Sequence, residues 1–312
     1  MFGKRVVRDL INHSTDNEVE RRVFLKAASA AGLGTVGAAG ATLLPAASAS
    51  ASTAGPGDLA VLNFALNLEY LEAQFYYYAV FGTGISSDLT TGRGRRGPVI
   101  GGSQVPFATP SIAAMAREIA QDELAHVKFL RSVLGSAKVA QPRIDLKTSF
   151  TAAAQAAGLI GPGQTFNPFL DENSFMLAAF IFEDVGVTAY KGASPLIRNK
   201  TYLEAAAGLL AVEAYHAGIL RARLYDRGLT AEAAKISDAR DSLDGPSDVD
   251  QGIGTPEMSN LVPTDENALA FSRSTGQVLN VVYLTPESRV RGGFFPRGVN
   301  GRIRRSGGVP PQ

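Results

Sequence analysis

The sequence contains no cysteine. The chain therefore forms no disulfide and holds no metal through thiolates, so any metal must be bound by glutamate, aspartate or histidine. Histidine itself is scarce, with three residues in 312. The formal net charge is only +1, which gives no general attraction to nucleic acid. Apolar residues make up 45% of the chain and charged residues 19%, which suits a globular protein with a sizeable core.

The first 51 residues carry a targeting pattern. Arg21 and Arg22 are followed by Val-Phe-Leu-Lys, by a weakly apolar Ala/Gly-rich run over residues 27–44, and by Ala-x-Ala steps over residues 45–51. A charged start, a short apolar run and small residues at a cleavage site define a secretory signal, and the arginine pair makes it a twin-arginine signal. Glu20 stands where Ser or Thr is usual. A membrane-spanning helix is disfavoured because the run is short and rich in glycine.

This pattern predicts that residues 1–51 are recognised by the twin-arginine translocase through Arg21 and Arg22 and are then removed. The mature chain would act in the periplasm, in the cell envelope or outside the cell. The twin-arginine route carries folded proteins, which suits a cofactor that is loaded before export.

Four long helices are predicted in the mature chain. The third and fourth are strongly apolar throughout, which places both in the interior of a bundle. Helix starts are read from capping residues and from proline in the first turn, and helix ends from glycine or proline. The predicted helices are 58–81 capped by Asp58, 110–134 capped by Thr109 and ended by Gly135, 172–193 capped by Asp171 or Asn173 and ended by Pro195, and 200–227 capped by Asn199 and ended by Gly228.

The connections within the bundle are long. The loop 82–109 contains Arg93, Arg95 and Arg96, which fit a solvated loop better than a binding patch. About 35 residues separate the second and third helices, with a short helix predicted near 148–157. This length suits a crossover along the bundle, because a 23-residue helix is about 35 Å long.

The last part of the chain is predicted to be a C-terminal extension with short helices that pack on the bundle. One helix is expected from Thr230 to about residue 243, and another from Asp265 to about residue 283. The tail is expected to pack through Phe294 and Phe295 and to fray after Arg304. The chain thus divides into a signal peptide (1–51), a four-helix bundle (52–228) and the extension (229–312).

Both histidines of the mature chain follow a glutamate by three positions, in Glu123-x-x-His126 and Glu213-x-x-His216, whereas His13 lies in the signal region. Residues at i and i+3 share one helix face, so each Glu–His pair can reach a single metal ion. One match alone is weak evidence, because a solvated glutamate and a hydrogen-bonded histidine give the same pattern. Two matches out of two are far less expected by chance.

The first and third helices carry a second repeated pattern. Glu69 is followed by Tyr76 seven residues later, and Glu183 is followed by Tyr190 at the same spacing. All four glutamates lie about eleven to fourteen residues into their helices, so at 1.5 Å per residue their depths agree within roughly 5 Å. The sequence therefore predicts a pseudo-twofold pair of helical hairpins that bring four glutamates to one level.

Burial of four carboxylates in one core requires compensating charge. Glu183 directly follows Phe-Ile-Phe, where an unpaired carboxylate would be costly. Two divalent cations would bring the formal charge to zero, and two neutral imidazoles would complete their ligands. Oxygen ligands with one imidazole per metal favour iron or manganese over copper, with zinc as an option. The predicted metal ligands are Glu69, Glu123, His126, Glu183, Glu213 and His216.

This set resembles the metal site of the ferritin-like carboxylate proteins, in which two helices each supply a Glu and two others each supply Glu-x-x-His. Over roughly residues 58–301, the stretches LNFALNLEYLEAQFY, DELAHVKFLR, EAYHAGILR and GGFFPRGVNG are similar to exported ferritin-like domain proteins related to plant desiccation-related proteins. The resemblance implies an all-α, ferritin-like four-helix bundle with one long crossover connection and an irregular, partly helical C-terminal extension. It implies no particular activity.

Four further residues near the predicted ligands have open roles. Glu72, one turn beyond the first ligand, is either an alternative ligand or a neighbour that supports the ligands. Asp122 either orients a ligand histidine, as in some di-iron enzymes, or is solvated; the fourth helix has Val212 at the matching place. Tyr76 and Tyr190 are expected to be core residues hydrogen-bonded to the glutamates rather than radical carriers.

The leading functional hypothesis is an exported di-metal protein that reacts with O2 or peroxide in stress protection, as a ferroxidase, a catalase or an oxidase of an organic substrate. The alternative is a non-catalytic envelope protein, related to desiccation or stress, whose metal site is structural or vestigial. Iron storage in a hollow shell is less favoured, because the long loops and the extension would obstruct packing into a cage. No nucleic-acid partner is expected, and a homo-oligomer is compatible with the sequence.

Overall fold

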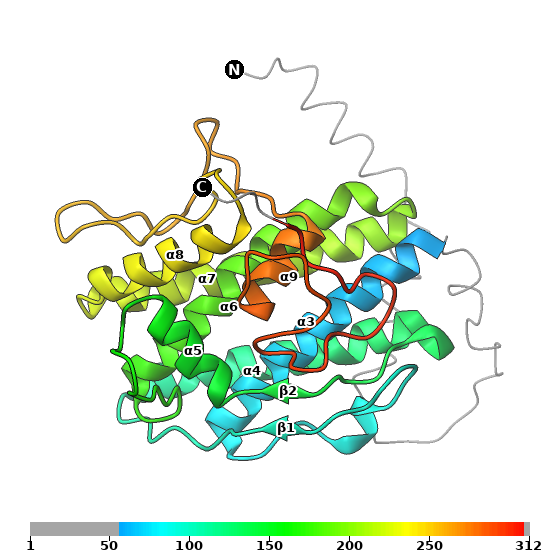
Figure 1. Ribbon diagram of the computed structural model, residues 1–312, viewed down its shortest axis with the longest axis horizontal. Helices are drawn as coiled ribbons and strands as arrows, with labels where there is room; N and C mark the ends of the chain where they lie inside the picture. The colour runs from blue at the N-terminus through cyan, green and yellow to red at the C-terminus, as the bar shows by residue number, and fades with distance from the viewer. Residues whose placement is uncertain (1–55, 309–312) are drawn as a thin grey trace, which may run out of the picture. The chain divides into compact units, whose positions relative to one another are not determined.

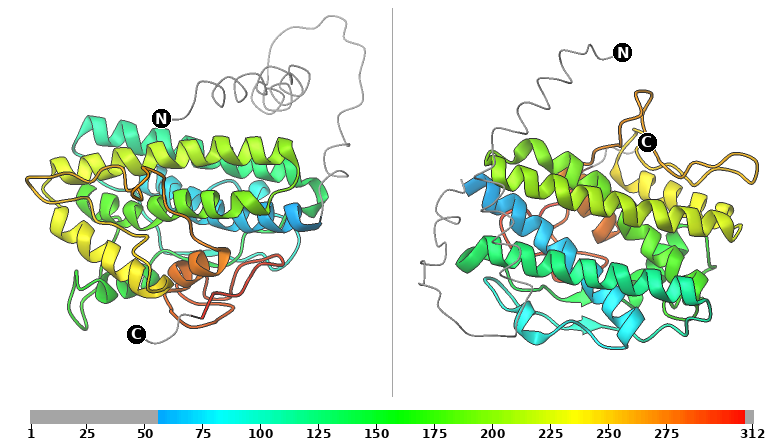
Figure 2. Two further views of the ribbon diagram at one scale, coloured as in Figure 1. Left: turned by 90° about the horizontal axis from the view of Figure 1, so that it is seen from above. Right: turned by 180° about the vertical axis from the view of Figure 1, so that it is seen from behind.

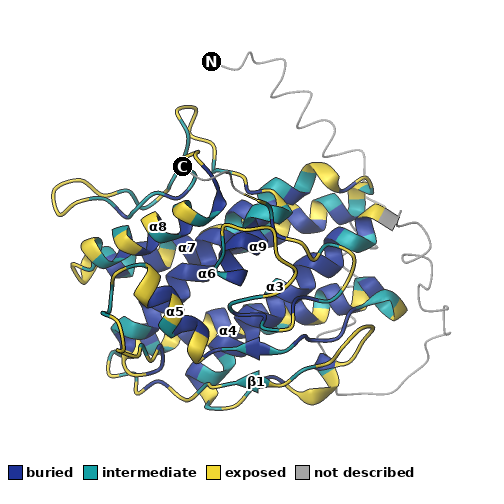
Figure 3. Cartoon of the chain, in the orientation of Figure 1, coloured by how far each residue is buried: buried dark blue, intermediate teal, exposed yellow. Residues whose placement is uncertain are grey.

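The computed structural model describes residues 56–308, and the predicted signal peptide with Arg21 and Arg22 lies outside these residues. Four long helices form a bundle in which α3 (Pro56–Phe81) packs along α4 (Pro110–Leu134), and α6 (Glu172–Ala193) packs along α7 (Lys200–Asp226). Helices α3 and α6 also contact each other, and the buried faces of the helices meet in the interior (Figures 1, 2 and 3). The predicted all-α four-helix bundle with a long crossover is confirmed.

Capping side chains set the starts of the two apolar helices. Asp171 accepts a hydrogen bond from the Ser174 backbone N–H at 2.8 Å, which decides between the two caps predicted for α6. The side chain of Asn199 accepts from the N–H groups of Thr201 and Tyr202 at the start of α7, as predicted. Helix α7 is long and apolar enough to cross a membrane by length and composition alone, but one of its faces is buried against α6.

Of the other two predicted caps, the one at Asp58 is wrong, whereas Thr109 is the N-cap residue of α4, as predicted. Helix α3 begins at Pro56, so Asp58 lies in its first turn, where its carboxylate accepts from the N–H groups of Arg198 and Asn199. Thr109 precedes Pro110 at the start of α4, but its hydroxyl donates to Glu172 at 2.8 Å and makes no hydrogen bond to its own helix. In both cases a polar side chain bonds to a distant segment of the bundle rather than to its own helix.

The crossover between α4 and α6 contains the predicted short helix, α5 (Thr148–Ala156). It also contains β2 (Ile144–Asp145), which pairs in parallel with β1 (Val99–Ile100) from the loop between α3 and α4. Short 3-10 turns cover Ser87–Thr90, Gly135–Ala137 and Ser194–Leu196. The three arginines of the loop, Arg93, Arg95 and Arg96, are exposed, as expected of a solvated loop.

The C-terminal extension packs on the bundle through α8 (Thr230–Asp244), α9 (Thr275–Tyr283) and the tail. Phe294 and Phe295 are fully buried, as predicted. The ring of Phe294 lies 5.0 Å from that of Phe150 on α5 and 4.9 Å from that of Phe182 on α6, with centroid distances typical of edge-to-face aromatic pairs. The tail thus closes the core on the α5 and α6 side.

Two predictions for the extension are wrong. The helix expected from Asp265 begins only at Thr275, because the Asp265 carboxylate accepts from the N–H groups of Asn267 and Leu269 and holds that segment in a turn. The start of α9 is fixed instead by a capping box between Ser274 and Gln277. The described part of the tail, up to residue 308, does not fray after Arg304, since Ser306 is buried and hydrogen-bonded to the backbone of Arg289.

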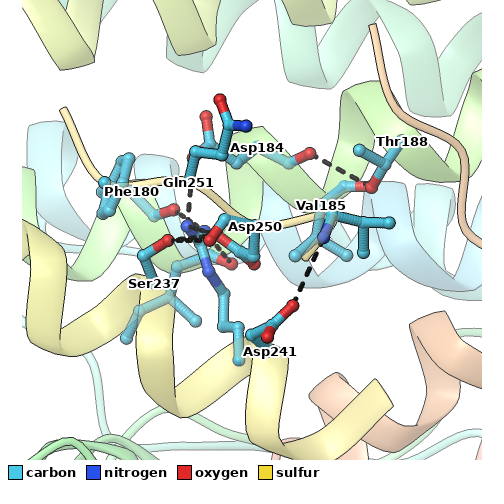
Figure 4. A network of polar contacts seen from close by, with 12 residues as sticks. Phe180, Asp184, Val185, Thr188, Ser237, Asp241, Asp250 and Gln251 are labelled. Carbon is cyan, nitrogen blue, oxygen red and sulfur yellow. Dashed lines mark hydrogen bonds and ion pairs between the residues drawn. The ribbon is translucent and has the colours of Figure 1, made fainter. Parts of the chain in front are cut away.

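A buried ion-pair network fastens the extension to α6 (Figure 4). Asp184 on α6 accepts from Arg221 at 2.7 Å and from Arg240 on α8 at 3.0 Å. Asp250 lies between Arg240 and Arg273, with 2.6 Å to each, and Arg273 also pairs with Asp244. Because these side chains are at most 7% exposed, every charge in the network depends on its partners rather than on water.

Candidate metal centre

The structure brings all six predicted ligand side chains together between the four long helices. None is more than 6% exposed. They form two groups in which the potential ligand atoms lie within 4.8 Å of one another: Glu69, Glu123, His126 and Glu213 in one, and Glu123, Glu183 and His216 in the other. Each group contains one histidine, and Glu123 belongs to both. The proximity of the six side chains is an observation, whereas their role as metal ligands stays a prediction.

Glu123 occupies the place of a bridging carboxylate. Its Oε2 atom lies 3.5 Å from Nδ1 of His126, and its Oε1 atom lies 3.2 Å from Nδ1 of His216. The two imidazole rings are 6.3 Å apart between centroids. One carboxylate can therefore serve both groups at once, with one oxygen directed to each.

The remaining carboxylates complete the two groups. Nδ1 of His126 is 3.2 Å from Oε2 of Glu69 and 3.6 Å from Oε1 of Glu213. Nδ1 of His216 is 3.4 Å from Oε2 of Glu183. Each histidine thus presents Nδ1, and not Nε2, to the carboxylates of its group.

Asp122 contacts His216 from the neighbouring helix. Its Oδ2 atom lies 3.2 Å from Nε2 of His216, and its side chain is 44% exposed. A carboxylate at Nε2 favours the tautomer that carries its proton there, which leaves the Nδ1 lone pair directed at Glu123 and Glu183. Val212 directly precedes Glu213 on α7, as Asp122 directly precedes Glu123 on α4, but its apolar side chain cannot accept a hydrogen bond from His126. The pseudo-twofold symmetry therefore does not include Asp122.

Two tyrosines hold carboxylates of the opposite helix. The hydroxyl of Tyr76 on α3 donates to Oε1 of Glu183 on α6 at 2.5 Å. The hydroxyl of Tyr190 on α6 donates to Oε1 of Glu69 on α3. Both tyrosines are buried and their pKa values are raised well above normal, by burial and by the nearby glutamates. The expected hydrogen bonds between these tyrosines and the glutamates are confirmed.

Burial and the crowding of carboxylates shift the pKa values in the cluster in the direction that favours positive charge. Burial raises the pKa of Glu69 to about 7, against the opposing effect of His126. Burial, followed by the charges of neighbouring glutamates, also raises the pKa of Glu213 well above its usual range. Burial alone would lower the pKa of His126, but Glu69 and Glu123 outweigh it and raise that pKa to about 12. The cluster therefore has a strong demand for positive charge.

Glu72 is a fifth carboxylate beside this cluster. It is 5% exposed but belongs to neither ligand group. Burial, and then the charges of Glu123 and Glu183, raise the pKa of Glu72 well above normal. The geometry thus agrees with Glu69, rather than Glu72, as the α3 member of the centre.

Unpartnered atoms provide a test of whether cations fit. In the described part of the chain, the buried atoms without a hydrogen-bond partner include both carboxylate oxygens of Glu123 and Glu213, Oε2 of Glu183 and Nδ1 of His216. Buried polar atoms are nearly always paired with a donor or a cation. The cluster has more acceptors than donors, so two divalent cations fit it. Carboxylate oxygens with one imidazole per group suit iron or manganese, with zinc as an option.

Sequence reasoning missed Gly186, which makes room for the centre. A Cβ atom at this position of α6 would collide with Oε2 of Glu213 and lie 3.1 Å from its Cδ atom. A glycine inside an apolar helix costs about 1 kcal/mol relative to alanine, so its presence there was a signal of close packing. Only a residue without a side chain allows the Glu213 carboxylate to lie against α6.

Replacing Gly186 by alanine should therefore displace Glu213 and weaken metal binding by about 10- to 100-fold, as expected when a residue that positions a ligand is changed. The affinity would be measured by competition with a chelator of known strength. Gly208→Ala on α7 is the matched control, because a Cβ atom there meets nothing within 4 Å. Equal affinities in the two variants would show that Gly186 has no part in placing the ligand.

Comparison with known proteins identifies the family. The ferritin-like domain family matches residues 57–226, the segment that carries all six side chains. The chain belongs to the ferritin-like domain family. This confirms the resemblance inferred from the repeated motifs.

This ferritin-like protein is similar to two named plant proteins over about four fifths of its length. It is 31% identical over 273 residues to ferritin-like catalase Nec2 of Nesocodon mauritianus, covering 80% of this chain and 85% of that protein. It is also 31% identical over 264 residues to desiccation-related protein PCC13-62 of Craterostigma plantagineum, covering 78% and 83%. The predicted similarity to plant desiccation-related proteins is thereby confirmed.

Proposed function

We propose that this ferritin-like protein is an exported di-metal catalase, which binds a pair of iron or manganese ions and disproportionates hydrogen peroxide. The observation that carries the proposal is the pair of buried ligand groups joined by Glu123. The similarity to a relative named as a ferritin-like catalase supports peroxide as the substrate. The twin-arginine pattern around Arg21 and Arg22 supports action outside the cytoplasm.

The metal pair, when bound, would supply a two-electron redox couple to peroxide. The protein side chains would hold and orient that pair. Asp122 accepts from Nε2 of His216 and so keeps the Nδ1 lone pair available, while Tyr76 and Tyr190 fix one oxygen each of Glu183 and Glu69. The six side chains are buried, which keeps bulk water away from the cluster.

Peroxide disproportionation is also the reaction with the fewest requirements. Two H2O2 give two H2O and one O2, so one peroxide is oxidised and the other is reduced. No separate reductant, electron-transfer partner or organic substrate is needed. A ferroxidase would instead need a supply of Fe(II), and an oxidase would need a binding site for its organic substrate beside the metals.

The test is oxygen evolution from H2O2 by protein loaded with manganese or with iron, followed with an oxygen electrode. We expect turnover by at least one metal form, and background rates from metal-free protein and from loaded His216→Ala. If loaded protein consumes Fe(II) and O2 but releases no O2 from peroxide, the centre is a ferroxidase. If neither reaction occurs, the proposed catalase activity and the ferroxidase activity are both excluded.

A non-catalytic role is the second candidate, because the desiccation-related relative is equally identical over a similar length. In that case the metals would be structural. Their removal would lower the midpoint of thermal unfolding, and the loaded protein would show no turnover of peroxide or O2. The same purified samples therefore separate the two functions.

A further inference from the structure

An open pocket of about 570 Å³ lies where the C-terminal tail meets the loop 82–109 and the start of α3. Its wall contains Leu59 and Ala60 of α3, Arg93 of the loop, and Arg302 and Arg304 of the tail. Pockets that hold small molecules typically measure about 300–1,000 Å³, so this one is large enough for such a ligand. The described residues that line it include none of the six in the metal centre, so it is a separate feature of the fold.

The charge in this pocket is of one sign. Arg93, Arg302 and Arg304 are exposed, and none of the described residues that line the pocket is acidic. Within the described part of the chain, the side chains of these three arginines make no hydrogen bond and no ion pair. Charges of one sign in a cleft reinforce one another and create a strong local potential. The pocket therefore attracts negatively charged molecules.

Hydrogen bonds fix the backbone that carries the arginines. The N–H of Arg93 donates to the backbone after α4 at 2.9 Å, and its C=O accepts from the same segment at 2.8 Å. Asn67 of α3 accepts from the N–H of Asn300 and donates to its C=O, at 2.9 Å in each bond. Further along the tail, the hydroxyl of Tyr283 donates to the C=O of Arg304 at 2.9 Å. Both segments are thus held in place before a ligand arrives, which lowers the entropy cost of binding.

Asn300 also joins the loop directly to the tail. Its side chain donates to the C=O of Arg95 and accepts from the N–H of the same residue, at 3.0 Å in both bonds. Gly94 lies against this side chain, and a Cβ atom there would come within 2.5 Å of Oδ1 of Asn300. The loop and the tail are therefore in contact within two residues of Arg93 and of Arg302.

An anion with several charged groups matches this arrangement. A guanidinium group pairs with a carboxylate or a phosphate through two parallel hydrogen bonds. Three such groups without an acid leave a formal charge of +3 to be balanced. A neutral or cationic molecule would leave all three guanidinium groups unpaired. The rest of the wall is partly apolar and can contact an apolar body; its apolar residues are Leu59, Ala60, Ala137 and Val139.

Arg93 by itself fits a solvated loop, but the fold adds Arg302 and Arg304 to the same pocket. We propose that the pocket binds a small soluble anion with about three negative charges, carried by carboxylate or phosphate groups. The arginines pair with these groups, and the apolar part of the wall contacts the body of the anion. The site does not depend on the metal centre or on its reaction.

The first measurement compares three anions that share one ring, by calorimetry on the full chain with its metals bound. Benzene-1,3,5-tricarboxylate, benzene-1,3-dicarboxylate and benzoate differ in the number of carboxylates. We expect the tricarboxylate to bind saturably at one site per chain, and each carboxylate removed to weaken binding about five- to tenfold. Carboxylates at these ring positions are too far apart to chelate one ion, so the probe leaves the metals in place.

Substitution of the arginines tests the place of binding. Arg304→Ala should weaken the binding of the tricarboxylate about five- to tenfold, and the combined replacement of Arg93, Arg302 and Arg304 by alanine should abolish it. The three side chains are exposed, so folding should be retained, and circular dichroism verifies it. Arg305→Ala is the matched control, because Arg305 is exposed and adjacent in the chain but does not line the pocket. It should bind the tricarboxylate like the parent.

Fructose 1,6-bisphosphate, which carries its charge on phosphate groups, distinguishes the two kinds of anionic group. Binding that is tighter than that of the tricarboxylate identifies phosphate, and weaker binding identifies carboxylate. The proposal is overturned if neither anion binds saturably, if benzoate binds as tightly as the tricarboxylate, or if Arg304→Ala and Arg305→Ala bind equally. Binding that is unchanged in the combined variant would also overturn it, because it would place the anion elsewhere in the molecule.

Discussion

Replacing Glu123 by glutamine should reduce the bound metal from about two ions per chain to one or none. Glu123 is the residue shared by both ligand groups, with one oxygen near each histidine. The amide keeps the size of the side chain but removes its negative charge and one strong oxygen ligand. Metal-to-protein ratios of purified protein, measured by mass spectrometry of the elements, give the result directly.

Two comparisons sharpen this experiment. Glu118→Gln makes the same chemical change at an exposed position of α4 and should leave both ions bound. His126→Ala removes a ligand from one group only, so it should lower the ratio to about one and keep the group of Glu123, Glu183 and His216. A ratio near two in the Glu123 variant would mean that this residue is not the bridge.

Replacing Asp250 by alanine should lower the free energy of unfolding by about 3–5 kcal/mol, the usual cost of removing one partner of a buried ion pair. Asp250 lies 2.6 Å from both Arg240 and Arg273, and its side chain is 1% exposed. Its removal leaves two buried guanidinium groups short of a counter-charge. Urea unfolding monitored by circular dichroism measures the change.

The control for this substitution lies two residues earlier. Asp248 is exposed, so Asp248→Ala should change the free energy of unfolding by no more than about 0.5 kcal/mol. Because Asp250 belongs to neither ligand group, its variant should still bind metal in the absence of denaturant. Equal stabilities for the two variants would show that the network does not fasten the extension.

The metal cluster could be predicted from the sequence because the residue spacings that indicate it lie within single helices. Glu-x-x-His and Glu-x6-Tyr spacings report a shared helix face, and the depth of each glutamate reports its level along the bundle. Because an unpaired carboxylate among aromatic side chains is costly, the position of Glu183 also indicated a nearby positive charge. These local patterns were enough to predict that six side chains lie close together, although up to 147 positions separate them in the chain.

Contacts that join separate segments could not be predicted in this way. The partners of Asp184 are Arg221 and Arg240, and no spacing rule connects an aspartate on one helix with arginines on two others. For Asp122 the sequence offered contact with a ligand histidine as one of two roles, but it could not identify His216, because the contact crosses from α4 to α7. Gly186 was missed because its role is set by a carboxylate on the opposite helix.

The wrong helix start at Asp265 has a related cause. The apolar pattern of that segment resembles a helix, but side-chain hydrogen bonds from Asp265 to its own backbone stabilise a turn instead. Irregular segments of the extension are held by such local bonds and by packing on α6 and α8. The spacing of apolar residues alone reveals neither these hydrogen bonds nor this packing.

The central claim is that two metal ions lie between α3, α4, α6 and α7, held by Glu69, Glu123, His126, Glu183, Glu213 and His216. Anomalous X-ray diffraction from crystals of the purified protein, recorded at the iron and manganese absorption edges, tests it most directly. The account predicts two anomalous peaks per chain inside this cluster, one beside each histidine. A cluster without anomalous density, or with metal found only on the protein surface, would contradict it.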